Sequence, residues 1–305
     1  MVNASNIEKP RARKAEIWQD KVFYWVVDIV LGIVLVTVLI PIFYVIANSL
    51  SSGNMVVSGR VFLWPVDFSL EGYQAVFSDR NILTGYANTL FYTVAGTTLN
   101  VVLTTAAAWA LSRQELPGRG VIMMLFAFTM IFKGGMIPDF LLVRDLGIMN
   151  TRLAIILPMA INVYNMVILR TFFANTIPRD LHEAAQLDGS SEFNFFLKIA
   201  LPLSKSGIAV IVLYYAVYHW NAFFNAFLYL TNKNLYPLQL VLRDILLANT
   251  LDAADTVTNE TINYLNRAEV IKYSLILVAC VPIWCVYPFV QKHFVRGVML
   301  GAIKG

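Results

Sequence analysis

Charged residues are scarce in this chain. Of its 305 residues, 14% are charged and 58% are apolar or aromatic, whereas soluble globular proteins average about 25% charged and about 45–50% apolar residues. The apolar residues are concentrated in runs of about 17–26 residues, the length that a helix needs to cross roughly 30 Å of hydrocarbon. The composition therefore excludes an ordinary soluble domain and predicts an integral membrane protein.

Residues for covalent chemistry, metal binding and nucleotide binding are lacking as well. Cys280 and Cys285 are five residues apart on one predicted helix, so they lie on different faces and cannot pair with each other. The three histidines lack the spacing of metal ligands, and neither a hydrolase motif nor a phosphate-binding loop occurs. The isoelectric point is near 9.0, but no basic run is interleaved with aromatic residues as nucleic-acid binding requires. We expect no catalytic residue, metal, cofactor or nucleic-acid partner.

Six apolar runs predict six transmembrane helices and an all-α fold. The third run is interrupted by Lys133-Gly134-Gly135 and Pro138, a break that lipid tolerates only where protein or a water-filled cavity surrounds the backbone. The first run is too long for a signal peptide and lacks a cleavage site, so we expect it to be a retained anchor. The six predicted spans are Val22–Ala47, Asn88–Leu111, Val121–Phe132 extended toward Leu142, Leu153–Leu169, Gly207–Leu230 and Val270–Val290.

The distribution of Lys and Arg predicts the orientation. These residues are denser in the segments that lie inside when the N-terminus is cytoplasmic, which by the positive-inside rule places both termini and residues 170–205 in the cytoplasm. The expected organisation is a cytoplasmic segment 1–21, a six-span domain 22–292 and a cytoplasmic tail 293–305.

Ionisable residues are nearly absent from the spans. Only Asp28 is acidic within a span, and we interpret it as hydrated near the headgroups or paired with a neighbouring subunit rather than as a coupling-ion site. Carriers driven by protons or sodium need more intramembrane ionisable groups than this. Any transport by this chain is therefore expected to take its energy from elsewhere.

An amphipathic segment, residues 178–205, separates the fourth span from the fifth. Pro178 followed by Asp180 predicts a helix start, with Asp180 as the N-cap and Glu183 three residues later as in a capping box. Ala184 and Ala185 are strong helix formers with little bulk.

The same segment then predicts a bend and a second helical piece. Gly189 allows a turn and a close approach by another backbone, and Pro202 is expected to end the second piece. An interfacial helix that only tethers two spans would explain the apolar face, whereas a small face beside one carboxylate also suits a groove on a cytoplasmic partner. The predicted apolar face comprises Phe193, Phe196, Leu197 and Ala200.

Several motifs resemble those of one family. Glu183-Ala184-Ala185, Asp188-Gly189, Ile199 and Leu201-Pro202-Leu203 resemble the EAA loop of binding-protein-dependent ABC importer permeases, and we call residues 178–205 the EAA segment. Over nearly the whole chain the resemblance is to the sugar-import branch with maltose-type inner-membrane subunits. FLWPVDFSLEGYQAVF resembles the first outer loop of that branch, and FKGGMIPDFLLVRDLGIMNT resembles the subfamily for complex oligosaccharides. One departure is Ser206, where relatives commonly have a further proline.

The resemblance implies a multi-pass permease subunit of an ATP-driven carbohydrate importer in a bacterial plasma membrane. Its implied partners are a second homologous permease, a cytoplasmic ATPase dimer that uses the ATP, an extracytoplasmic sugar-binding protein and the lipid bilayer. The tail from Gly297 to Gly305 would reach along the ATPase dimer. The residues implied in ATPase coupling are Glu183, Ala184, Ala185, Asp188, Gly189, Leu201 and Pro202.

A sugar path is less clearly marked in the sequence. Aromatic rings with a polar group, and amides, suit a sugar with its C–H faces and hydroxyls, but the same residues also pack helices and bond between spans. Two alternatives stay open: an ABC permease for a non-sugar solute such as a peptide or polyamine, and a stand-alone secondary carrier or membrane enzyme. The candidate path residues are Asn162, Tyr164 and Asn165 in the fourth span, and Tyr214, Tyr215, Tyr218, Trp220 and Asn221 in the fifth.

Overall fold

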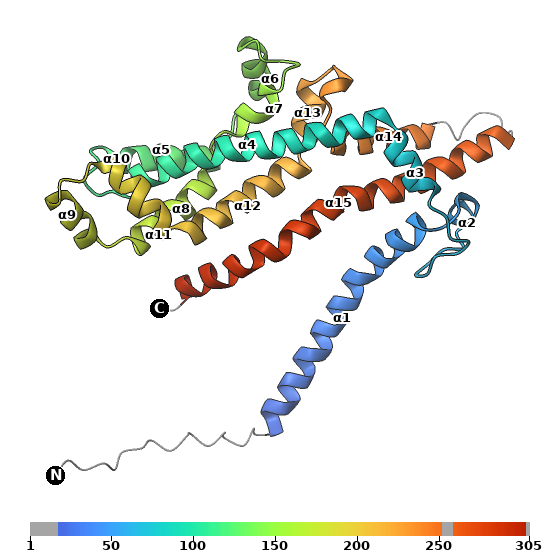
Figure 1. Cartoon of the computed structure of the whole chain (residues 1–305), viewed down its shortest axis with the longest axis horizontal. Helices are drawn as coiled ribbons and strands as arrows, with labels where there is room; N and C mark the ends of the chain where they lie inside the picture. Colours follow the sequence, from blue (N-terminus) through green and yellow to red (C-terminus); the bar gives the residue numbers. More distant parts are fainter. Residues whose placement is uncertain (1–17, 252–258, 303–305) are drawn as a thin grey trace.

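The computed structural model describes residues 18–251 and 259–302, so the predicted segment up to residue 17 and residues 303–305 of the predicted tail lie outside the described residues. All the regular elements in these ranges are helices, which confirms the predicted all-α fold (Figure 1). In chain order they are α1 (Trp18–Ser49), α2 (Gly53–Val57), α3 (Glu71–Ser78), α4 (Arg80–Ser112), α5 (Arg119–Ile131), α6 (Met136–Asp145), α7 (Leu153–Ile156), η1 (Leu157–Met159), α8 (Val163–Thr176), α9 (Arg179–Leu187), α10 (Glu192–Phe195), η2 (Phe196–Ala200), α11 (Leu201–Leu203), α12 (Lys205–Asn221), α13 (Phe224–Tyr229), η3 (Lys233–Leu235), α14 (Leu238–Leu251) and α15 (Asn259–Ala302).

Helix α4 is the centre of the bundle. It begins after Asp79, whose side chain accepts a hydrogen bond from the backbone N–H of Asn81 at 2.7 Å and so satisfies a free donor of the first turn. It packs along α8 and α12 (Figure 1). Close packing with α12 depends on Gly96, because a Cβ atom there would lie 2.5 Å from the ring of His219.

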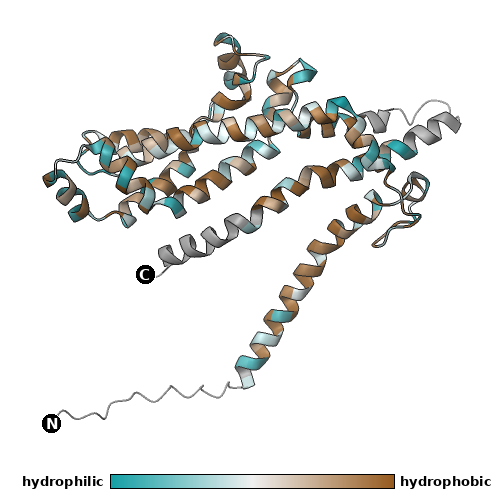
Figure 2. Ribbon diagram, viewed as in Figure 1, coloured by the Kyte–Doolittle hydropathy of each residue, from teal (hydrophilic) through white to brown (hydrophobic). Residues whose placement is uncertain are grey.

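Helix α1 leaves the bundle and touches it only near its C-terminal end. There Ala47 packs with Val56, Val61 and Val270 of the neighbouring segments, while the most apolar 18-residue stretch of α1 has no residue buried by the rest of the described chain. Figure 2 shows that this exposed surface is hydrophobic along most of the helix. An apolar helix of this length needs lipid or another protein around it.

The described residues hold up to six candidate spans, three of them bent helix pairs. One of these pairs joins Glu192–Leu203 to α12 and so includes part of the EAA segment, which the sequence placed in the cytoplasm. Asp20–Ser49, Arg80–Ser112 and Asn266–Val286 are each long and apolar enough to cross a membrane. Helices α5 and α6 are bent by 115° at the predicted break, where Gly135 adopts a φ of +88°. The predicted fifth span was too long, because α12 ends at Asn221 and a separate helix, α13, follows it.

Candidate functional site

The EAA segment forms short helices at one end of the bundle (Figure 1). Helix α9 starts directly after Pro178, whose extended backbone has φ −62° and ψ 148°, and no side chain caps it. The prediction of Asp180 as the N-cap, with a capping box to Glu183, is therefore wrong. Asp180 lies inside the first turn instead, where a negative charge is favourable to the helix dipole.

One side of α9 is anchored to the chain and the other is exposed. His182 is 5% exposed, its Nε2 lies 2.7 Å from Oε1 of Glu192, and its ring packs edge-on against Phe195 at 4.9 Å. Glu183 and Ala184, the next two residues, are exposed to solvent. The helix thus presents a carboxylate and a small side chain outward from a fixed position.

Gly189 makes the turn that ends α9. Its φ is +76°, which residues with a side chain rarely adopt, and the N–H of Ser190 returns to donate to the carbonyl of Ala185 at 2.9 Å. A Cβ atom on Gly189 would meet nothing within 4 Å in the described chain. The structure therefore explains Gly189 by the turn itself, and its predicted close contact with a partner stays a prediction.

The second helical piece contains a π-helical turn, η2, between α10 and α11. Phe195 and Ala200 are buried, five residues apart as the wider π turn requires, whereas Phe193 and Leu197 are exposed. The predicted apolar face, with Phe193 and Leu197, was therefore wrong in part because it assumed a regular α-helix. The chain bends by 81° before α12, directly after α11, so the predicted stop near Pro202 is confirmed.

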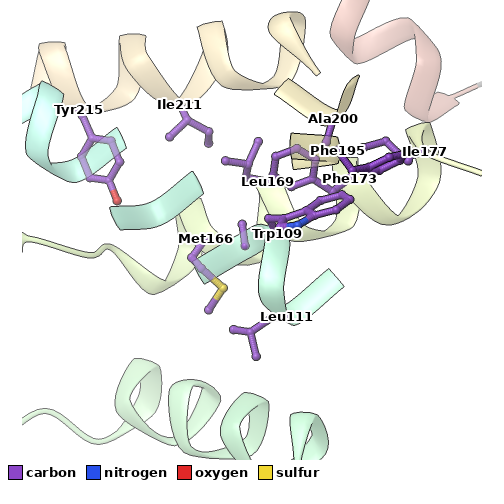
Figure 3. Close-up of a cluster of buried hydrophobic side chains, with 11 residues drawn as sticks. Trp109, Leu111, Met166, Leu169, Phe173, Ile177, Phe195, Ala200, Ile211 and Tyr215 are labelled. Carbon is purple, nitrogen blue, oxygen red and sulfur yellow. The ribbon is translucent and has the colours of Figure 1, made fainter. Parts of the chain in front are cut away.

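Trp109, near the end of α4, joins the EAA segment to the bundle (Figure 3). Its ring stacks on Phe195 with centroids 5.8 Å apart, lies 5.7 Å from Phe196 and meets Phe173 of α8 edge-on at 5.5 Å. Trp109 is only 8% exposed. The Trp109 side chain of α4 therefore packs the EAA segment against both α4 and α8.

A groove of about 550 Å³ opens between α9 and the loop after α4. Trp109, Arg113, Glu115, Arg179 and Glu183 contribute to its walls. The pKa of the Glu115 carboxyl is lowered, first by a hydrogen bond from its own backbone and then by the charges of Arg113 and Arg179. This side of the EAA segment is thus open, with charged side chains on partly apolar walls.

Apart from the half-buried Asn162, the candidate path residues divide into a buried and an exposed group. Tyr215 is 2% exposed, and its hydroxyl accepts from the backbone N–H of Asn162 at 2.9 Å and lies 2.7 Å from Oγ1 of Thr104. Asn165 is also buried, and Trp220 donates from Nε1 to the carbonyl of Ala279 at 3.0 Å. The Tyr215 contacts hold the break between η1 and α8 against α4 and α12, whereas the Trp220 bond joins α12 to α15. The exposed group comprises Tyr164, Tyr214, Tyr218 and Asn221.

A second polar contact supports the same break. Nε2 of His219 lies 2.7 Å from Oδ1 of Asn100, and the amide nitrogen of Asn100 donates to the carbonyl of Met159. His219 and Asn100 are both buried. Two helices, α4 and α12, therefore satisfy backbone groups that the interruption of the fourth span leaves free.

The sequence is similar to those of known proteins over most of its length. Protein LplC of Bacillus subtilis (strain 168) is 40% identical over 274 residues, which cover 90% of this chain and 92% of that protein. The polygalacturonan/rhamnogalacturonan transport system permease protein YtcP of the same strain is 42% identical over 266 residues, 87% of this chain and 92% of that protein. The chain belongs to the permeases of carbohydrate ABC importers.

A solved structure agrees with this assignment to the permease family. The crystal structure of a bacterial ABC transporter involved in the import of the acidic polysaccharide alginate matches with a TM-score of 0.84 and 36% identity, covering 92% of this chain and 100% of that chain. No protein-family model matches the sequence.

The permease is thus a multi-pass protein of the cell membrane and a subunit of an ABC importer for oligosaccharides or polysaccharides. It is a transporter subunit rather than an enzyme. This decides between the alternatives that the sequence left open, because neither a peptide or polyamine permease nor a stand-alone carrier fits these relatives.

Sequence reasoning missed three residues that organise the permease. His182 and His219 were considered only as metal ligands, and Trp109 was not singled out, because its aromatic partners are distant in the sequence. A signal for His219 did exist: the second span carries Gly96 and Asn100 four residues apart, a small and a polar residue on one helix face.

Proposed function

We propose that the permease works with a second homologous permease chain, a cytoplasmic ATPase dimer and an extracytoplasmic sugar-binding protein. The observation that carries this proposal is the exposed face of α9, with Glu183 and Ala184 outward and His182 anchored behind them. A rigid, small-faced helix beside one carboxylate fits a groove on a partner protein. Both termini and the EAA segment would then lie on the cytoplasmic side, with domain limits at 22–292 and a tail at 293–305.

In this proposal Glu183 pairs with a basic side chain of the ATPase. The exposed Ala184 and the half-buried Ala185 allow close approach, Asp188 and Gly189 form the turn, and Leu201 with Pro202 directs the chain into α12. Losing one partner of a buried interfacial charge pair costs roughly 2–5 kcal/mol, largely because the other charge stays unpaired.

The carbohydrate itself is proposed to pass the exposed aromatic and amide side chains of α8 and α12. Tyr164 is 60% exposed and presents a ring with a hydroxyl, which suits the C–H faces and hydroxyls of a sugar. The buried candidates Asn165, Tyr215 and Trp220 are assigned to structure, since neighbouring helices enclose them and keep them out of reach of a passing sugar. The proposed path residues are Tyr164, Tyr214, Tyr218 and Asn221.

The test is uptake by the reconstituted importer together with retention of the ATPase. Glu183→Ala should reduce both strongly, without changing the affinity of the sugar-binding protein. Asp180→Ala is the matched control, because Asp180 is an exposed carboxylate of the same helix. Transport at the wild-type rate by Glu183→Ala, with the ATPase fully bound, would show that the EAA segment is only a tether.

A further inference from the structure

Arg152 is a basic residue of the proposed outer half of the permease. It lies directly before α7, its side chain is exposed, and none of the ion pairs found among the described residues includes it. By contrast, Arg144 is paired with Asp145 at 2.9 Å and Arg243 with Asp244 at 3.3 Å. Arg152 is therefore a cation without a carboxylate partner in the described chain.

The guanidinium of Arg152 is nevertheless held in place. Its carbon Cζ lies 4.4 Å from the centre of the Phe91 ring, and an Nη atom donates to Oδ1 of Asn88 at 3.4 Å. Stacking on an aromatic ring uses the flat face of a guanidinium and leaves its edge N–H groups directed outward. Most of its five donors thus remain available for a ligand.

Hydrogen bonds to two backbone carbonyls hold the Asn88 side chain, which orients Arg152, in place. Asn88 is 4% exposed, and its amide nitrogen donates to the carbonyl of Asn234 at 2.7 Å and to that of Tyr236 at 3.1 Å. These bonds leave only Oδ1 for Arg152. The buried amide, the aromatic ring and the guanidinium form a preorganised group from α4, η3 and the start of α7.

The position of this group suits the outer mouth of a transport path. Helix α4 has 33 residues and is about 50 Å long, whereas the hydrocarbon layer is about 30 Å thick, so the helix extends beyond the layer. In the proposed orientation Phe91, which belongs to the N-terminal half of α4, then lies near the outer edge of the hydrocarbon layer. The neighbouring helix α6 carries exposed charges, Asp139, Arg144 and Asp145, which need water or protein rather than acyl chains around them. Helix α6 also stands off from the bundle on one side (Figure 1).

We propose that Arg152 binds a carboxylate of the carbohydrate, so that the permease carries an acidic oligosaccharide. Arginine recognises a carboxylate through two parallel N–H···O bonds, and Phe91, which is 41% exposed, offers an apolar surface to the adjoining sugar ring. The proposal rests on the proposed function, since it assumes that the carbohydrate passes this side of the permease.

The test uses the complete importer, with its own binding protein, in proteoliposomes. The probes are galacturonate oligomers of two to four units, alginate oligomers, and neutral arabinan and maltodextrin oligomers, with uptake identified by mass spectrometry. The wild type should take up acidic oligomers. Arg152→Gln should raise the KM for these by about tenfold or more, equivalent to about 1.4 kcal/mol, while basal ATP hydrolysis and complex assembly stay unchanged.

Two controls separate ligand binding from structure. Arg144→Gln removes a paired, exposed arginine of the same region and should leave the KM unchanged, and Arg152→Lys should recover only part of the affinity because lysine lacks the planar fork. A wild type that imports only neutral oligomers, or an Arg152→Gln variant with an unchanged KM or with impaired assembly, would overturn the assignment of Arg152. A wild type that imports no carbohydrate at all would contradict the proposed function instead.

Discussion

Replacing Trp109 by alanine should uncouple ATP hydrolysis from transport. Trp109 is 8% exposed, and two of its three aromatic partners, Phe195 and Phe196, belong to the EAA segment. Truncating a buried tryptophan costs about 3–5 kcal/mol in total. The two lost aromatic pairs, with Phe195 and Phe196, account for about 1–3 kcal/mol of this. The equilibrium between the EAA segment packed on α4 and the segment detached from it would therefore shift toward the detached form by roughly 5–150-fold.

The assay is the amount of sugar imported per ATP hydrolysed by the reconstituted importer. Trp109→Phe keeps a ring against Phe195 and should lose much less coupling than Trp109→Ala. Trp18→Ala is the control for the loss of a tryptophan, because Trp18 is 76% exposed at the start of α1, far from the EAA segment (Figure 1). If Trp109→Ala imports as much sugar per ATP as the wild type, the aromatic joint does not transmit the coupling and this reasoning fails.

Three further substitution or labelling experiments test the packing, the turn and the topology. Gly96→Val should destabilise the permease by about 1–3 kcal/mol or more, because its Cβ would lie 2.5 Å from the His219 ring, and a lowered thermal midpoint in detergent checks this. Gly189→Asn should retain most uptake if only the positive φ matters, since asparagine tolerates that conformation; equal loss in Gly189→Asn and Gly189→Leu would instead indicate a partner contact. Cysteines at Ser58 and Ser190 should react with an impermeant reagent from outside and from inside, respectively; labelling of Ser190 from outside in sealed cells would reverse the topology.

The amino-acid sequence was sufficient to predict an integral membrane protein, its candidate spans and the permease family. These follow from composition, run length and a contiguous motif, all of which are local: an apolar run of sufficient length crosses a bilayer whatever its neighbours are. The break in the third span was predicted in the same way, from Lys133-Gly134-Gly135, because glycine and charge disfavour a continuous helix wherever they occur.

Which side chains are buried against a neighbouring helix and which are exposed could not be predicted from the sequence, because this depends on the tertiary structure. Tyr214 and Tyr215 are adjacent and chemically identical, yet one is 40% exposed and the other 2%, because only Tyr215 points at Thr104 and the break before α8. The π-helical turn displaced the predicted apolar face, and the roles of Trp109 and Arg152 depend on residues distant in the sequence. The period of a helix predicts which residues share a face. Whether that face is buried depends on the segments that pack against it, and the whole fold determines those.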